Sequence, residues 1–279
     1  MKNLFILLLI TLPLTAVQSQ ETIYPLRDIF EAGTLIDNQT VNTPFKGLME
    51  LQIQHRFGLV NTNGIEDVFG IYAPSNIRMG MNFGITDRIM VGVGYTKDYK
   101  LLDLQGKYAI LYQKSDGSFP VSVTYYGNMV TGLLPESEFG PEEAYREIHR
   151  LSYFNQVIVA RKFNDVFSLQ VAPTFFYYNS VTTGYKNANF GLSVGGRAMF
   201  IPSHSLTLEY NQNFTAQENE AFDPKPQLAI GWEKSTATHA FQVFFANYKG
   251  IVQQRNFLYN QNDLTEGEYL IGFNITVKF

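Results

Sequence analysis

The last eleven residues alternate between apolar side chains and side chains that are mostly small or polar. Every second position is apolar, at Tyr269, Ile271, Phe273, Ile275, Val277 and Phe279. A period of two is typical of a β-strand with one apolar and one polar face. In a membrane barrel the apolar face meets lipid and the polar face lines the lumen. The pattern, with the chain stopping on phenylalanine, predicts a strand of such a barrel.

The first nineteen residues predict a secretory signal peptide. Lys2 supplies a positive charge, residues 4–14 form an apolar run, and small residues precede a cleavage point after Ser19. The run is shorter than the roughly 20 residues that a membrane-spanning helix needs. A membrane anchor is the alternative interpretation, and the absence of cysteine argues against a lipoprotein.

Composition narrows the class of protein. Aromatic residues make up 15% of the chain, with 23 Phe and 17 Tyr, whereas charged residues make up only 16%. This balance suits a wall that meets lipid and rims that meet headgroups. A net charge of -4 without basic clusters argues against nucleic acid as a partner, and zero cysteines exclude disulfides and thiolate metal sites. Without a later apolar helix, only a closed barrel could span a membrane.

Twelve alternating segments are expected between residues 47 and 279, with ten and fourteen strands as neighbouring solutions. The clearest are residues 47–57, 76–84, 101–113 and 189–200. Short connections mostly alternate with long ones, as in outer-membrane barrels, and an even strand number places both termini on the periplasmic side. Pro173 is expected to weaken its strand or mark a bulge. The fold class predicted is therefore an all-β antiparallel transmembrane barrel, with a soluble two-sheet sandwich as the alternative.

Charged residues at inward positions are the candidate functional residues of the lumen. The main ones are Arg56, Arg78, Asp103, Lys107, Arg197 and Glu209. Because Arg197 and Glu209 are equidistant from Ser203 at the centre of a turn, we expect a cross-strand ion pair between them. Arg56 and Arg78 lie on neighbouring strands. One interpretation is an internal network in which Asp103 or a carboxylate from a loop neutralises them. The other is a constriction of the lumen that favours anions.

The lumen could be open or filled. Large side chains are expected to point inward, namely Tyr126, Phe154, Phe176, Tyr178 and Phe244. A twelve-stranded barrel is intermediate between barrels that side chains fill and barrels that leave a channel. Residues 20–46 form a separate N-terminal segment, which either enters the lumen from the periplasmic side or lies across its mouth.

Few residues suggest catalysis or metal binding. His55 and His149 lie near the outer rim, but His149 and Ser152 are three positions apart and point to opposite faces of a strand, which disfavours a catalytic dyad. An enzyme at the rim therefore stays a minor alternative. The acidic loop of residues 134–147 lacks the spacing of a calcium site. Neither a cofactor nor a metal is expected.

Several short motifs resemble an uncharacterised outer-membrane β-barrel family of Gram-negative bacteria, a domain of unknown function. They occur at residues 55–58, 76–80, 83–88, 91–94 and 107–108, with Gln113. The resemblance covers Leu35 to the C-terminus and implies a barrel in the outer membrane, without implying a chemistry. The C-terminal strand, with Tyr269, Val277 and Phe279, also resembles the signal by which such barrels are recognised for assembly.

The function expected from these features is a narrow passive channel, or a transport-related barrel, for small polar solutes. A closed barrel that acts structurally or through its extracellular loops is the main alternative. The expected partners are outer-membrane lipid, lipopolysaccharide and the barrel-assembly machinery.

Overall fold

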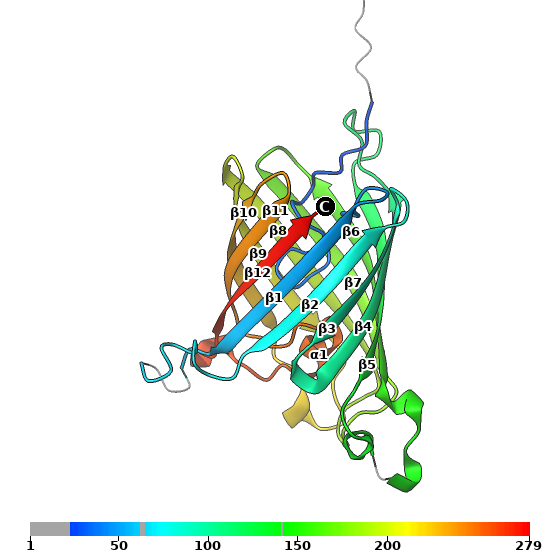
Figure 1. Cartoon of the computed structure of the whole chain (residues 1–279), viewed down its shortest axis with the longest axis vertical. Helices are drawn as coiled ribbons and strands as arrows, with labels where there is room; N and C mark the ends of the chain where they lie inside the picture. The colour runs from blue at the N-terminus through cyan, green and yellow to red at the C-terminus, as the bar shows by residue number, and fades with distance from the viewer. Residues whose placement is uncertain (1–22, 62–64, 141) are drawn as a thin grey trace, which may run out of the picture.

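One antiparallel sheet closes on itself to form a barrel. The computed structural model describes residues 23–61, 65–140 and 142–279, so the expected signal peptide lies outside the described residues. In the order of the barrel wall each strand pairs with its neighbours in sequence, and β1 closes the ring by pairing with β12 (Figure 1). The twelve-stranded barrel predicted from the sequence is confirmed, and the sandwich alternative is wrong because a single closed sheet forms.

The twelve strands cover most of the chain after residue 48. They are β1 (Met49–Leu59), β2 (Asn76–Gly84), β3 (Ile89–Thr96), β4 (Leu101–Leu111), β5 (Ser122–Gly132), β6 (Leu151–Lys162), β7 (Phe167–Tyr178), β8 (Ala188–Ile201), β9 (His204–Asn213), β10 (Gln227–Ser235), β11 (His239–Ala246) and β12 (Leu270–Lys278).

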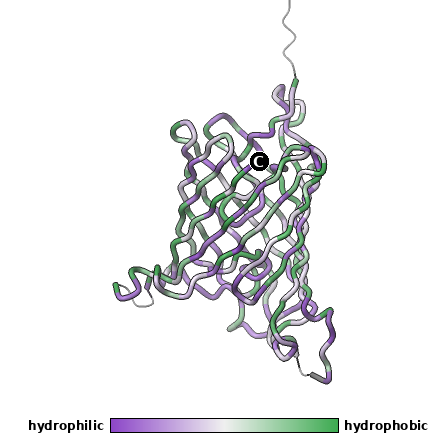
Figure 2. Tube along the Cα trace, in the orientation of Figure 1, coloured by the Kyte–Doolittle hydropathy of each residue, from purple (hydrophilic) through white to green (hydrophobic). Residues whose placement is uncertain are grey.

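The side chains of each strand alternate between the two faces of the wall. In β9, Leu206, Leu208 and Tyr210 are exposed on the outside, whereas Ser205, Thr207 and Glu209 are buried inside. The tube in Figure 2 shows the corresponding alternation of apolar and polar residues along the strands. An apolar exterior around a polar interior is the reverse of a soluble protein and is typical of a barrel in lipid.

The two ends of the barrel differ. The end that holds the N-terminal segment and the C-terminus is here called the terminal end, and the other is called the loop end (Figure 1). Long connections gather at the loop end and include the short 3-10 helices η2 (Glu136–Phe139), η3 (Glu142–Ala144) and η4 (Glu147–Arg150). The 3-10 helix η1 (Asp98–Lys100) forms the tight loop-end turn between β3 and β4.

Other short helices lie in the same loops. They are η5 (Glu220–Phe222), the α-helix α1 (Gln253–Tyr259) and η6 (Leu264–Glu266). Among the described residues, no helix is both long and apolar enough to cross a membrane.

Pro173 lies in β7 and interrupts the ladder to β6. The paired residues jump from Gln156 and Thr174 to Val159 and Val171. Proline has no N–H to donate, so this position cannot complete the ladder. On its other side Pro173 still pairs in register with Leu192 of β8.

Substitution on the lipid face is expected to be costly. Val93 of β3 is exposed on the outside and pairs with Met81 and Leu104 in the middle of the wall. Because an arginine there would face hydrocarbon, we expect Val93→Arg to lower the free energy of unfolding by about 2–4 kcal/mol. Urea titration in lipid vesicles measures the change. The matched variant Ile65→Arg, in the exposed loop after β1, should stay within about 0.5 kcal/mol. Equal effects of the two substitutions would contradict the assignment of the faces.

Candidate functional site

Residues 28–43 fill the lumen and are here called the plug. They enter from the terminal end, where the blue N-terminal segment in Figure 1 passes inside the wall. Ile29, Leu35, Ile36 and Asn38 are almost completely buried. The plug folds into a tight hairpin, in which the amide of Leu35 donates to the carbonyl of Asn38 at 2.9 Å. Of the two placements that the sequence left open, the structure has this segment inside the barrel.

Glu209 of β9 holds the tip of the plug. Its Oε1 accepts the backbone N–H groups of Ile36 at 2.7 Å, Asp37 at 3.0 Å and Asn38 at 2.8 Å. The hydroxyl of Tyr248 donates to Oε2 at 3.0 Å. Hydrogen bonds to a charged acceptor are stronger than neutral ones, and a buried carboxylate requires them. The Glu209 carboxylate therefore binds three successive amides of the plug.

Lys107 of β4 holds the base of the same hairpin. Its Nζ donates to the carbonyl oxygens of Gly33 at 2.6 Å, Thr40 at 3.0 Å and Asn42 at 3.2 Å. The ammonium thus uses its three donors on the plug backbone. Since Glu209 takes amides and Lys107 takes carbonyls, the two charges on opposite sides of the wall complement the backbone of one hairpin.

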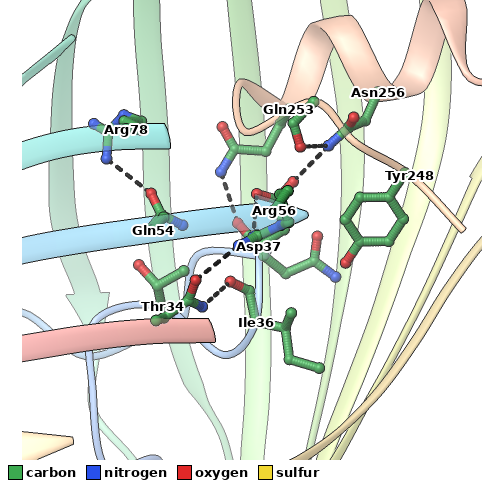
Figure 3. Close-up of polar contacts among 12 residues, drawn as sticks. Thr34, Ile36, Asp37, Gln54, Arg56, Arg78, Tyr248, Gln253 and Asn256 are labelled. Atoms are coloured by element: carbon green, nitrogen blue, oxygen red, sulfur yellow. Dashed lines mark hydrogen bonds and ion pairs between the residues drawn. The ribbon is translucent and has the colours of Figure 1, made fainter. Parts of the chain in front are cut away.

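Asp37 links the plug to both the wall and the loop end (Figure 3). Its carboxylate lies 3.6 Å from the guanidinium of Arg56, which also donates to Asn274 Oδ1 at 2.8 Å. From α1, Gln253 donates to the Asp37 carbonyl and Asn256 donates to Oδ2, each at 2.9 Å. The tip of the plug therefore contacts α1 at the loop end of the barrel.

Arg78 forms a separate pair with Asp103. Nε and Nη2 of Arg78 donate to the two carboxylate oxygens at 2.9 and 2.6 Å, and Nη1 donates to Gln54 at 3.0 Å. Because Arg56 has Asp37 and Arg78 has Asp103, each guanidinium has its own carboxylate. The internal network is thus the arrangement that occurs while the plug is in place, and the two arginines do not form an uncompensated constriction.

The expected cross-strand pair of Arg197 and Glu209 is wrong. Arg197 lies opposite Thr207, and Glu209 lies opposite Gly195. A tight turn at residues 202–203 and a register shift between Met199 and Ile201 move the strands out of the symmetric register. Arg197 instead forms an ion pair with Glu31 of the plug, and Lys278 donates to the Glu31 carbonyl at 2.5 Å.

One side of the plug is apolar. Ile29, Phe30, Leu35 and Val41 pack in one cluster with side chains of β5–β7 and α1 that point into the lumen, namely Tyr126, Phe154, Ile158, Phe176, Phe257 and Leu258. Of the inward aromatic side chains predicted from the sequence, Tyr126, Phe154 and Phe176 form this apolar bed and Tyr178 packs against it. Phe244 lies instead in a second apolar cluster with Ile36 of the plug.

The plug leaves little free space in the lumen. Two cavities that border it, one beside Arg78 and Tyr126 and one beside Ile29 and Tyr112, have volumes of only about 10 Å³ each. A cavity of this size holds at most about one water molecule. Two larger clefts, of about 310 and 810 Å³, open at the loop end on either side of Tyr99. This conformation of the barrel is therefore closed.

The loops that border these clefts are tied to one another. Lys225, before β10, donates to Asp263, before β12, at 3.0 Å. The Thr265 hydroxyl and amide donate to the same carboxylate, and together with Lys225 they lower the pKa of Asp263 to about 2. The link therefore stays ionised well into the acid range.

The other candidate groups from the sequence do not form a reaction centre. His149 Nδ1 accepts the amide of Arg146 at 3.3 Å, and Ser152 Oγ accepts from Gln254 at 3.2 Å. No hydrogen bond joins His149 to Ser152 in the described part of the chain. His55 stacks on Phe273 at 5.0 Å on the outer face. Within the described ranges, no group of three His, Asp or Glu side chains could hold a metal ion.

The C-terminal residues complete the wall. Val277 pairs with Leu51 of β1 and His239 of β11, and the backbone of Phe279 exchanges two hydrogen bonds with Met49. Tyr269 accepts the amide of Val60 at 2.8 Å, just beyond the last rung of β12. These contacts give the segment a structural role, and its role as an assembly signal stays a prediction.

Sequence reasoning missed α1 and the contacts that join it to the plug. The segment of residues 251–258 carries a signal that could have identified it. Its polar stretch, Gln253 to Asn256, lies between apolar pairs at residues 251–252 and 257–258, which is unusual for a solvated loop.

Comparison with known proteins gives a family and a fold. Residues 30–279 match the model of the membrane-bound beta barrel domain family, DUF5777. The chain belongs to this family. The resemblance seen in the short motifs is thereby confirmed, and the barrel is membrane-bound. No curated protein matches the chain significantly.

Three solved structures of similar fold have titles that name a porin or an outer-membrane channel. The NanC porin has a TM-score of 0.51 and 10% identity, covering 83% of this chain and 98% of its own. The KdgM porin has a TM-score of 0.47 and 7% identity, with the same coverage of both chains. An outer-membrane channel from Pseudomonas putida F1 has a TM-score of 0.49 and 10% identity, covering 85% of this chain and 97% of its own. At such identities the likeness concerns the fold alone.

Removal of the Glu209 charge is expected to loosen the plug. Glu209→Gln replaces a charged acceptor of three amides by a neutral one. We expect the free energy of local opening at residues 36–38 to fall by about 1.5–3 kcal/mol, measured by hydrogen exchange. Glu233→Gln is the matched control, because this buried carboxylate accepts from Gln242 of the wall rather than from the plug. Unchanged hydrogen-exchange protection at residues 36–38 in Glu209→Gln would show that the Glu209 carboxylate does not hold the plug.

Proposed function

We propose that this protein is an outer-membrane channel for small polar solutes, and that the structure is its closed state. The plug is the gate, and the charged wall behind it is the path. The single observation that carries the proposal is how the plug is held, namely by side chains that line the lumen and not by strand pairing.

The attachment of the plug makes it separable from the barrel. Its backbone hydrogen bonds are internal, between Gly33 and Thr40 and between Leu35 and Asn38. Among the residues that the structure describes, no backbone–backbone hydrogen bond joins residues 28–43 to a strand. Leu26, outside the plug, bonds to Gln113 at the terminal end and tethers the segment there. Departure of the plug would therefore leave every rung of the barrel intact.

Departure of the plug would also expose a hydrophilic wall. Arg56, Lys107, Arg197 and Lys278 would lose partners, and three carboxylates, Glu50, Glu209 and Glu233, share the same lumen. A permanently closed barrel gains little from such a set, because even paired buried charges often stabilise a protein no more than well-packed apolar side chains would. A wall that periodically meets water does need them. The small excess of cations supports a mild preference for anions.

The barrel is expected to lie with its terminal end in the periplasm. Short connections at that end and long ones at the loop end support this orientation, as does the predicted signal peptide. Outer-membrane lipid and lipopolysaccharide would then surround the wall. The barrel-assembly machinery would meet the C-terminal strand with Tyr269, Val277 and Phe279. The titles that name porins among the similar structures are consistent with a place in the outer membrane, but the proposal does not rest on them.

A closed barrel that serves as an envelope scaffold is the second candidate. The apolar contacts of the plug with Tyr126, Phe154 and Phe176 favour it, because they stabilise the filled lumen. The two candidates differ in whether the plug can leave.

Deletion of the plug separates them. In a planar bilayer we expect the full-length chain to be mostly silent and a chain lacking residues 28–43 to give stepwise conductance, because the filled space becomes aqueous. Because α1 also occupies the loop end, a second variant combines the deletion with a short Gly-Ser linker in place of residues 251–260. Heat-modifiable mobility and circular dichroism check that both variants form barrels. Conductance in either variant supports the channel, whereas silence in both folded variants contradicts it.

Substitutions in the conducting variant identify its path. Lys107→Gln should shift the reversal potential toward cation preference, because it removes a positive charge that faces the emptied lumen. The double variant Arg78→Gln with Asp103→Asn is the matched control. It removes a bidentate pair that carries no net charge, so the reversal potential should stay the same.

A further inference from the structure

Two clefts open at the loop end, and Arg255 of α1 borders both of them. The larger cleft, of about 810 Å³, is lined by Tyr99, Val130, Tyr178, Tyr185, Arg255 and Tyr259. Its volume is within the range of sites that bind small organic molecules. Helix α1 thus has two roles by position, since Gln253 and Asn256 contact the plug whereas Arg255 and Tyr259 line the cleft.

The guanidinium of Arg255 lies between two aromatic rings. Its Cζ is 3.1 Å from the centre of the Tyr99 ring and 4.9 Å from the centre of the Tyr259 ring. The side chain is half-buried. Within the described residues it has neither a hydrogen bond nor an ion pair, so its five N–H donors are unused. The stacked rings hold the guanidinium in one orientation and leave the N–H groups at its edge free, as bidentate binding of a carboxylate requires.

The turn that carries Tyr99 has an unusual backbone. Tyr99 has a φ of 61° and Lys100 has a φ of 48°, and both values are in the left-handed region that glycine usually occupies. A strained backbone persists only where the surrounding structure enforces it, and strained residues are common at binding sites. Here the strained turn places the Tyr99 ring on Arg255.

The charges around Arg255 favour an anion in the larger cleft. Arg150 also lines this cleft, and its guanidinium donates to the carbonyl oxygens of Gly132 and Leu134. Arg150 is also 3.3 Å from Glu147, so Arg255 is the cation with free donors. The carboxylate lining this cleft is Glu138, which is exposed. On the other side of Tyr99, Lys249 and Asp98 pair with each other at 3.8 Å in the smaller cleft.

We propose that the larger cleft binds a small organic anion that carries a ring, with its carboxylate on the Arg255 guanidinium and its ring against the tyrosines. The chemistry of the cleft selects both parts. An anion without a ring would leave the apolar surfaces of Tyr178 and Tyr185 uncovered, and a neutral ring would leave the donors of Arg255 without an acceptor. The inference rests on the proposed channel only in that this ligand would be a solute that the barrel admits.

Three probes separate the two parts of the ligand. Benzoate has both the carboxylate and the ring, benzamide keeps the ring without the charge, and acetate keeps the charge without the ring. With the purified full-length barrel in detergent, calorimetric titration should give a dissociation constant for benzoate at least tenfold lower than for either of the other two. Equal affinities for benzoate and benzamide, or no benzoate binding, would overturn the proposal.

Two variants locate the site. Arg255→Gln and Tyr99→Leu should each weaken benzoate binding at least tenfold. The first removes the guanidinium that binds the carboxylate, and the second removes the ring that orients this guanidinium. Arg146→Gln is the control, because it removes an exposed positive charge from the neighbouring loop outside the cleft. Thermal melting confirms that the variants are folded. Wild-type affinity in both cleft variants would overturn the proposal.

This test is independent of conductance because the plug stays in place. Benzoate binding together with silent plug-deleted barrels would support the site and contradict the channel. Conductance without benzoate binding would do the reverse.

Discussion

Backbone hydrogen bonding in hydrocarbon is the constraint on which the structure depends. A sheet edge cannot be left open in lipid, because each unpaired amide or carbonyl would cost several kcal/mol. The pairing of β1 with β12 removes both edges, from Glu50 opposite Lys278 to Leu59 opposite Leu270. Once the ring is closed, the period of two in every strand places apolar side chains toward lipid and leaves the polar ones enclosed.

The enclosed polar set creates a second requirement, because its charges need partners. The barrel supplies only part of them, as in the pair of Arg78 and Asp103. The plug supplies much of the rest by presenting its backbone to Glu209 and Lys107 and its carboxylates to Arg56 and Arg197. The plug is therefore the internal counterpart of the wall, and the absence of strand pairing in its attachment is the feature on which its proposed role as a gate rests.

The wall was predictable from the sequence because its signal is local. Alternation within each strand is sufficient to assign its faces, and residues 76–84 were assigned to a strand with the bounds that β2 has. The predicted first strand, residues 47–57, differs by two residues from β1, because alternation does not mark where pairing ends. Pro173 was recognised for the same local reason, since proline lacks a donor wherever it lies.

The partners of the lumen charges were not predictable in the same way. The turn at residues 202–203 was expected, but the register shift beside it depends on the pairing of two whole strands, and it moved Arg197 away from Glu209. The plug has no periodic pattern, so its depth in the lumen could not be read from its residues. Likewise, the contacts of Asp37 with Arg56 and α1 join three segments far apart in the chain.

Collision of nitroxide spin labels with oxygen and with a polar relaxation agent tests the central claim most directly. Because the chain has no cysteine, single cysteines can be introduced in lipid-reconstituted barrels at Leu206, Thr207 and Leu208 of β9 and at Asn38 of the plug. The account predicts high oxygen collision at residues 206 and 208, and shielding from both agents at residues 207 and 38. High oxygen collision at residue 207 would contradict an apolar exterior around a polar lumen. Exposure of residue 38 to the polar agent in the resting full-length barrel would contradict a lumen that the plug fills.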